Sequence, residues 1–204
     1  MTEQTYDLHA FARDARHALA RQRQEDAARR IKEHLESFLR HPSLVETYVK
    51  GEHIPTGNVI YKDPDFGFMV LVHFFPKPMK SPPHDHGPCW VCYGVYRQST
   101  DMGVYRRRDD GSRPEYCDLE ESEHFTLLEG QARAFLPYDI HHIQQHQPGA
   151  VVVRVTGRDL ELVERRTFQP DSHRVIITRP RERSWEDGGN GSATPDAAPR
   201  QAAS

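Results

Sequence analysis

The sequence predicts a mainly β protein, an antiparallel sandwich or barrel with a helical cover at its N-terminus. Residues 8–40 contain neither glycine nor proline, and apolar residues recur there at helical spacing. From Gly51 onward, short runs of β-branched and aromatic residues are separated by turn-forming stretches. Short strands at regular spacing, with no helical stretch between them, are typical of antiparallel sandwiches and barrels.

The N-terminal region is expected to form two helices, over about 7–21 and 24–40, or one long helix with a break. The apolar stripe lapses across the polar stretch at 21–26, and Pro42 ends the second helix. We expect these helices to cover the rest of the domain, and an autonomous partner-binding helix is the less favoured alternative. The stripe consists of Leu8, Phe11, Ala15, Leu19, Ala27, Ile31, Leu35 and Phe38.

The β-rich region contains seven strong strand candidates, and a weaker pair of strands is expected near 160–168 and 173–178. Turn signals rich in Pro, Gly and Asp lie between the candidates and favour antiparallel connections. The seven candidates are 58–61, 68–75, 90–96, 103–108, 124–128, 132–136 and 150–156.

Three regions are expected along the chain. After Trp185 the sequence has almost no large apolar residues, so burial cannot offset the entropy of ordering. The predicted regions are a helical cover over 1–45, a barrel domain over 46–184 and a disordered tail over 185–204.

Composition argues against several classes of partner. The 204-residue chain carries 27 Lys and Arg against 30 Asp and Glu, a formal net charge of −3. Without a basic field, neither nucleic acid nor a membrane is expected as a partner. No apolar stretch approaches the roughly 18 residues of a membrane span, and the N-terminus lacks the apolar core of a secretory signal. Three cysteines form no disulfide framework, so the expected location is the reducing cytoplasm.

The chain has 13 histidines, and two of them form the motif Pro82-Pro83-His84-Asp85-His86-Gly87. On a strand, side chains alternate between faces, so His84 and His86 would point the same way and Asp85 the opposite way. Two imidazoles on one face can bind a single divalent metal. An isolated H-x-H is a weak signal, because a His-rich chain shows it by chance.

A third ligand is expected about 50 residues further on, where the segment starting at Pro137 ends in His141 and His142. A strand there could run beside the first segment and bring one imidazole to the same point. The two histidines face opposite ways on a regular strand, so only one can be a ligand, and spacing alone does not choose between them.

These motifs resemble the cupins, small double-sheet β-barrels, and among them the cysteine-dioxygenase type of thiol dioxygenase. Residues 81–96, SPPHDHGPCWVCYGVY, resemble that group's P-x-H-D-H-G-x-x-W-x-x-Y-G, and residues 136–143 resemble its P-x-D-I-H-x-I/V. The closing strand at 151–160 and the segment 60–68 support the resemblance, which spans roughly 51–170.

The resemblance implies a mononuclear Fe(II) held by His84, His86 and His141, with His142 as the alternative third ligand. Such an enzyme adds O2 to the sulfur of a small thiol to give a sulfinate, so its partners are the thiol and O2. Ordinary cupins add a glutamate four or five positions after the second histidine, where this chain has Trp90 and Val91. Neutral ligands leave the iron its full positive charge, which favours a thiolate ligand.

The closing strand departs from the resemblance. Members that act on amino-acid or propionate thiols carry Ser-x-His-x-Tyr there, and this chain has Val152, Arg154 and Thr156. Another phenol could substitute, and Tyr93 is taken as the candidate catalytic residue, although sequence alone places none of them. The other candidates are Tyr96, Tyr105 and Tyr138.

The cation that binds the substrate carboxylate in those members is also absent from its usual place in this chain. It is an arginine in the strand region before the histidines, and residues 51–79 contain none. Arg154 could take over this role by bidentate pairing if it faces inward. The equally weighted alternative is a surface salt bridge.

The C-x-x-C formed by Cys89 and Cys92 is interpreted as two ordinary core thiols. Counted along a continuous strand, Cys92 would share the face of His84 and His86, and Cys89 would face away. Trp90 is expected to pack in the barrel or to form a pocket wall. Two further functions stay open, a metal-dependent lyase or isomerase and a non-catalytic metal-binding cupin, and the oligomeric state is undetermined.

Overall fold

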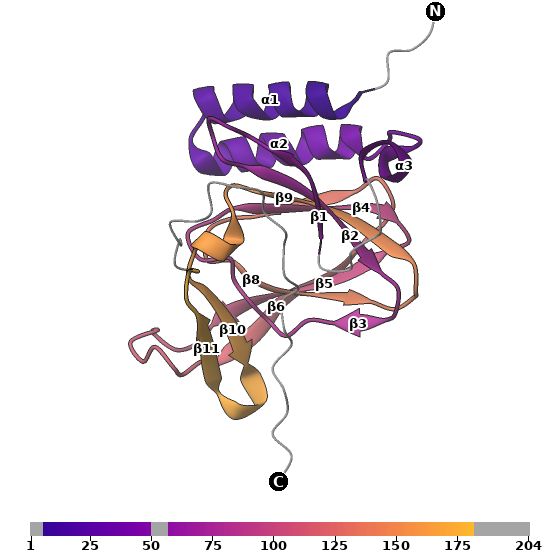
Figure 1. Cartoon of the computed structure of the whole chain (residues 1–204). Coiled ribbons are helices and arrows are strands. Elements are labelled where there is room, and N and C mark those ends of the chain that lie inside the picture. Colours follow the sequence, from indigo (N-terminus) through magenta and orange to yellow (C-terminus); the bar gives the residue numbers. More distant parts are fainter. Residues whose placement is uncertain (1–5, 50–56, 182–204) are drawn as a thin grey trace, which may run out of the picture.

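The computed structural model describes residues 6–49 and 57–181 (Figure 1). The predicted tail over 185–204 lies outside the described residues. The two predicted N-terminal helices are confirmed as α1 (Leu8–Arg21) and α2 (Gln24–Phe38), and a short α3 (Leu44–Tyr48) follows that the sequence did not predict. Helix α1 begins after Asp7, whose carboxylate accepts a hydrogen bond from the Ala10 amide at 2.8 Å.

The strands form two main sheets, and every strand pair that forms them is antiparallel. The larger sheet has the order β1 (Asn58–Lys62), β2 (Met69–Phe75), β9 (Ala150–Thr156), β4 (Val91–Arg97), β7 (Ala132–Phe135). The smaller sheet has the order β3 (Met79–Lys80), β8 (Ile140–Gln145), β5 (Thr100–Arg107), β6 (Leu119–Leu127). The predicted weak pair is the antiparallel hairpin β10 (Arg165–Gln169) and β11 (Arg174–Thr178).

Each sheet contributes one face to a shared interior. Figure 1 shows the two sheets stacked below the helices. The interior is closed by apolar side chains from both sheets, among them Val95 on β4, Met102 on β5, Ile143 on β8 and Val152 on β9. This arrangement is a cupin barrel, or double-stranded β-helix, as the sequence predicts.

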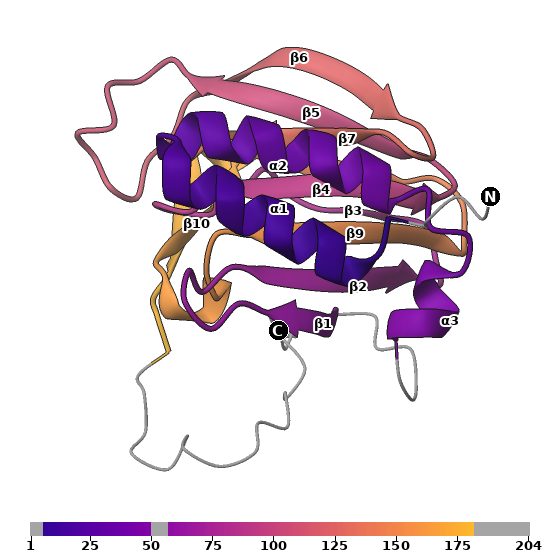
Figure 2. The ribbon, with the colours of Figure 1, turned by 90° about the horizontal axis from the view of Figure 1, so that it is seen from above.

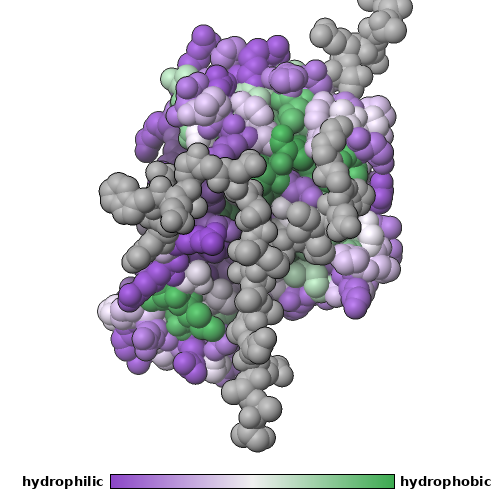
Figure 3. All heavy atoms as spheres, in the orientation of Figure 1, coloured by the Kyte–Doolittle hydropathy of each residue, from purple (hydrophilic) through white to green (hydrophobic). Residues whose placement is uncertain are grey.

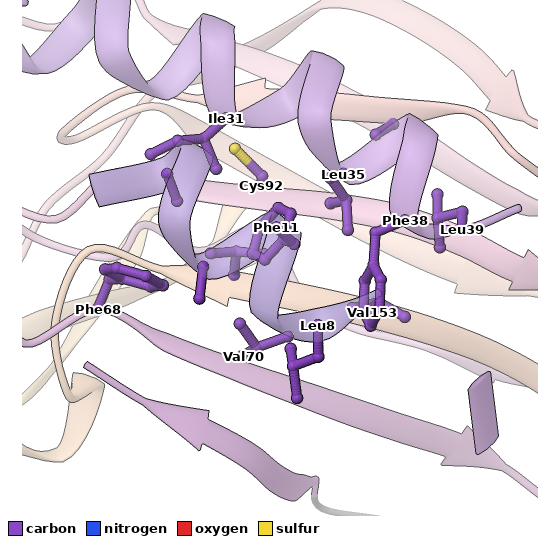
Figure 4. Close-up of a cluster of buried hydrophobic side chains, with 14 of the residues drawn as sticks. Leu8, Phe11, Ile31, Leu35, Phe38, Leu39, Phe68, Val70, Cys92 and Val153 are labelled. Carbon is purple, nitrogen blue, oxygen red and sulfur yellow. The ribbon is translucent and has the colours of Figure 1, made fainter. Parts of the chain in front are cut away.

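Helices α1 and α2 lie across the outer face of the larger sheet, as Figure 2 shows from above. Figure 4 shows the side chains between the two layers, including Phe11, Leu35 and Phe38 from the helices and Val153 from β9. Because β2 and β9 are covered on both faces, they read as nearly continuous apolar runs rather than as alternating ones.

A buried carboxylate fastens α1 to the turn between β1 and β2. Asp63 is 2% exposed, accepts hydrogen bonds from the Tyr61 hydroxyl and the Phe66 amide, and pairs with Arg16 at 2.5 Å. These bonds compensate the cost of burying the charge, and they lower the pKa of Asp63 against the opposing effect of burial.

The outer surface of the helices is polar, and purple side chains dominate that part of Figure 3. Within the described part of the chain, no helix is both long enough and apolar enough to cross a membrane.

The helix–sheet contact makes a testable prediction. Leu35 is fully buried, so Leu35→Ala is expected to lower the free energy of unfolding by about 2–5 kcal/mol through lost burial and a residual cavity. The matched control is Leu128→Ala at a site that is 55% exposed, where the change is expected to stay within about 0.5 kcal/mol. Urea unfolding followed by circular dichroism measures both, and equal losses would contradict the assigned core.

Candidate metal centre

Three imidazoles from two distant segments meet inside the barrel. The ring centroids of His84 and His141 lie 4.7 Å apart, those of His84 and His86 5.0 Å, and those of His86 and His141 5.2 Å. One ligand atom from each histidine can be chosen so that all lie within 4.8 Å of one another. Among the described residues, this is the one group of three or more metal-type side chains that could hold an ion, and it contains no carboxylate.

Backbone pairing brings the two segments together. His84 and His141 form an isolated antiparallel bridge, with the His84 amide 2.9 Å from the His141 carbonyl and the His141 amide 3.0 Å from the His84 carbonyl. Directly bridged residues place their side chains on the same face. The expectation that the second histidine segment runs beside the first is therefore confirmed at this residue pair.

The expectation that His84 and His86 lie on a regular strand is wrong. Apart from the bridge at His84, residues 81–90 form no strand, and Gly87 adopts a left-handed φ of 57°. A Cβ at Gly87 would lie 2.1 Å from the Glu164 carbonyl oxygen, so only glycine fits. The two imidazoles nevertheless lie on the same side of the chain, as expected, with their ring centroids 5.0 Å apart.

Asp85 points away from the imidazoles and anchors the turn. It is 2% exposed and accepts hydrogen bonds from the Gly87 amide at 3.0 Å and the Arg166 amide at 2.9 Å. The Arg166 guanidinium lies 3.8 Å away. Burial raises the pKa of Asp85, and these two hydrogen bonds and the Arg166 charge oppose the rise.

The structure brings His141, and not His142, to the other two imidazoles. His142 faces the outer side of the smaller sheet, where its Nδ1 lies 2.8 Å from the Tyr105 hydroxyl. Gly103 on β5 leaves room for this ring, because a Cβ there would lie 2.4 Å from His142 Cε1. Side chains alternate between the two faces of β8, so His141 points into the barrel and His142 points out of it. The spacing of histidines in the sequence could not make this distinction.

The three rings present free nitrogen atoms. Nδ1 of His84 lies 3.0 Å from the Pro82 carbonyl, which can only accept, so Nδ1 carries the proton and Nε2 keeps a lone pair. Nδ1 of His86 and both ring nitrogens of His141 are buried without a hydrogen-bond partner. Unpartnered buried nitrogens are costly, and a metal ion would satisfy one nitrogen of each ring.

The rings are neutral, as metal ligands must be. Burial lowers the pKa of His84 to about 4, and the positive charges of Arg154 and Arg165 add to the effect. Burial also lowers the pKa values of His86 and His141 well below the usual value, and the other imidazoles contribute. The site is therefore ready to bind a cation at neutral pH without first releasing protons.

Two aromatic rings form the wall of the site. Phe135 stacks on His141 with centroids 3.9 Å apart. The Tyr93 hydroxyl lies 3.1 Å from His86 Nε2, and burial raises the pKa of this phenol, so it stays protonated at neutral pH. Tyr93 is the candidate phenol that the structure places against the imidazoles.

The other tyrosines of the prediction lie elsewhere. Tyr96 packs on the helix side and donates to the Pro42 carbonyl at 3.2 Å. Tyr105 lies beside His142 on the outer face. Tyr138 is 53% exposed and lies under the Arg166 guanidinium.

Arg154 faces the barrel interior. It pairs across the sheet with Tyr93 and with Leu71, and its neighbour Val152, two residues earlier, belongs to the interior core. A second arginine, Arg165 at the start of β10, was missed by the sequence reasoning. Its positive charge contributes to the lowered pKa values of His84 and His86. Nothing in the sequence indicated this position, because Arg165 lies outside the histidine motifs, in a segment whose strand pattern is weak.

The predicted faces of the cysteines are wrong. Cys92 points toward the helices, as Figure 4 shows, and its thiol donates to the Ala28 carbonyl at 3.4 Å. Trp90 also packs in the helix-side core instead of forming a pocket wall, and Cys89 lies in the interior core. The turn at Gly87 interrupts the alternation of side chains between the two faces. Counting alternate residues from His84 therefore assigns the residues of β4 to the wrong face. Burial raises the pKa values of both thiols, which fits unreactive core residues.

Two open cavities lie away from the imidazoles. One, of about 290 Å³, lies at the ends of β2 and β9, and Phe74, Phe75 and Val151 line it. The other, of about 340 Å³, lies between α1 and α2 and is polar. Neither contains a residue of the histidine group.

Comparisons with known proteins give structural similarity alone, since no family model and no curated protein matches the sequence. KdgF from Halomonas sp. aligns with a TM-score of 0.39 and 15% identity, over 52% of this chain and 82% of its own. An uncharacterised protein with a double-stranded β-helix domain from Klebsiella pneumoniae gives 0.40 and 15%, over 55% and 80%. The hydroquinone 1,2-dioxygenase PnpCD, solved with Cd2+ and 4-hydroxybenzonitrile, gives 0.40 and 12%, over 54% and 68%.

The lowered pKa values predict that the metal-free protein loses stability in acid. Between the unfolded-state pKa of about 6.5 and the folded-state pKa of about 4 for His84, the unfolded chain binds a proton that the folded chain does not. The free energy of unfolding therefore falls as the pH falls through this window. We expect the urea midpoint to drop between pH 7 and pH 4.5, and His84→Gln to show a shallower drop. Identical slopes for the two proteins would contradict the lowered pKa of His84.

Proposed function

We propose that the protein is a mononuclear non-haem iron dioxygenase that converts a small thiol to its sulfinate. The reaction is RS⁻ + O2 → RSO2⁻, in which both oxygen atoms are added to sulfur and no other reductant is consumed. The observation that supports it is the group of three neutral imidazoles, His84, His86 and His141, without a carboxylate.

The donor set fits a divalent metal. Imidazole suits Fe(II), and a site of three neutral ligands leaves the ion its full charge. That charge lowers the pKa of a bound thiol and favours a thiolate ligand. Fe(II) bound there would supply the one-electron chemistry that lets O2 react with a thiolate sulfur.

The residues around the imidazoles would orient the reactants and exclude water. Phe135 covers one face of His141 and limits access of water to it. Tyr93 holds a proton on its hydroxyl beside His86 and can donate a hydrogen bond into the site. Arg154, on the strand next to Tyr93, can pair with an anionic group of the substrate.

Metal content tests the ligand assignment. The variants His84→Ala, His86→Ala and His141→Ala are each expected to lose at least 90% of the iron bound after anaerobic loading, because two imidazoles seldom hold the ion. His142→Ala is the matched control, since it removes the adjacent imidazole on the opposite face and is expected to keep the iron. Iron per chain is measured by elemental analysis, with circular dichroism to confirm folding. Loss of iron in His142→Ala alone would contradict the assignment.

Oxygen consumption tests the reaction. The iron-loaded protein is expected to consume one O2 per thiol oxidised, with the sulfinate identified by mass spectrometry. Turnover of substrate without O2 would instead indicate a metal-dependent lyase or isomerase. Metal binding with no turnover over a panel of thiols would indicate a non-catalytic cupin.

Tyr93→Phe tests the role of the phenol. This change removes the hydroxyl beside His86 and keeps the ring, so iron binding is expected to stay intact. The value of kcat is expected to fall about 100–1000-fold, in the range of a lost donor or general acid. Tyr96→Phe is the control, because its hydroxyl lies on the helix side. Equal kcat values for wild type and Tyr93→Phe would rule out this role.

A further inference from the structure

Two arginine side chains reach the histidine group from different elements. Arg154 lies on β9 in the row that faces the interior, because the alternate residues Val153 and Val155 belong to the helix-side core. Its Nε atom is buried and has no hydrogen-bond partner. The guanidinium also lies close enough to Tyr93 to oppose the rise of the phenol pKa.

Arg165 reaches the same place from the hairpin. His84 is bridged to Thr167 as well as to His141, so the three side chains share one face. Arg165 lies two residues before Thr167 on β10 and therefore points to that face as well. Its Nε atom is also buried without a partner.

The alternate residues of β10, Arg166 and Phe168, support this orientation because they face the other way. Phe168 packs with Ile140 on the outer side of β8, opposite to His141. Arg166 pairs with Asp85 and Glu164 and lies over the Tyr138 ring. The arginine that faces outward thus has acidic partners.

The two arginines that face inward have none. In the described residues, no Asp or Glu oxygen lies within 4.0 Å of a nitrogen of Arg154 or Arg165. The charges that act on His84 and His86 come from arginines and other imidazoles, and no carboxylate is among them. Both arginines are partly buried, and their Nε atoms are fully buried without a hydrogen-bond partner. Such unpaired donors, on cations without a counter-charge, are unfavourable unless a ligand supplies the anions.

We propose that Arg154 and Arg165 form the binding site for two anionic groups of the substrate, so that the thiol is a dicarboxylate. A guanidinium pairs with one carboxylate through two parallel hydrogen bonds, so two guanidiniums match two carboxylates. A thiol with a single carboxylate leaves one arginine uncompensated, and a thiol with an amine adds a repulsive charge. This inference rests on the proposed thiol oxidation for the identity of the reacting group. The anion site itself does not need the oxidation.

Binding of sulfur-free probes to the metal-free protein tests the anion site directly. By calorimetry, succinate is expected to bind at least tenfold more tightly than butyrate. Arg154→Gln and Arg165→Gln are each expected to weaken succinate binding at least tenfold, and Arg165→Lys to recover part of the loss. Arg174→Gln removes an exposed guanidinium from the neighbouring strand β11 and is expected to leave the affinity unchanged. Circular dichroism shows whether each variant is folded.

The outcomes separate the two proposals. Equal affinities for succinate and butyrate, or an unchanged succinate affinity in a folded Arg154→Gln or Arg165→Gln variant, would overturn the anion site. With iron loaded, kcat/KM for mercaptosuccinate is expected to exceed that for 3-mercaptopropionate and for cysteamine at least tenfold. Succinate binding without thiol-dependent O2 uptake would overturn the oxidation and keep the anion site. Thiol-dependent O2 uptake without preference among the thiols would overturn the dicarboxylate proposal and keep the oxidation.

Discussion

The backbone pairing of His84 with His141 is the contact on which the rest of the site depends. It is an isolated bridge and not part of a long ladder, and two hydrogen bonds of 2.9 and 3.0 Å hold it. The same loop is held from the other side, because the Phe168 amide donates to the Pro83 carbonyl at 2.8 Å. The loop with the H-x-H motif thus lies between β8 and β10, and this position brings a third imidazole and an arginine to it.

The acidic residue inside the H-x-H motif shows how the site stays free of negative charge. A carboxylate between two imidazoles would be a natural third ligand. The Asp85 side chain instead points away from the imidazoles and accepts hydrogen bonds from the Gly87 and Arg166 amides. Its buried charge is compensated by hydrogen bonds and by the Arg166 guanidinium, so the cost of burial is offset locally. The three imidazoles therefore form the ligand group alone, and the positive charges of Arg154 and Arg165 have no carboxylate partner nearby among the described residues.

Much of the fold could be predicted from the sequence, since periodicity and turn residues report on burial and chain reversal. The two helices and the seven strand candidates illustrate this. The site was predictable only in part. The motifs indicated His84, His86 and His141, but the choice against His142 needed the register of β8. The prediction that Cys92 shares the face of His84 and His86 was wrong, because Gly87, with its positive φ, forms a turn where a continuous strand was assumed. Arg165 could not be found because its position follows from the long-range bridge between His84 and Thr167.

The closing strand gives the departures from the expected pattern a common explanation. Val152, Arg154 and Thr156 all occupy the interior row of β9, and two of these three positions carry buried polar atoms without partners. His73, across from Val152 on β2, adds another unpartnered nitrogen. A barrel selected for stability alone would fill such positions with apolar side chains, because each unpaired donor costs free energy. Local conflict of this kind is expected at binding sites, where a ligand completes the hydrogen bonds that the fold leaves open. The interior of this barrel is therefore polar and positively charged where the imidazoles meet, and apolar where the two sheets close.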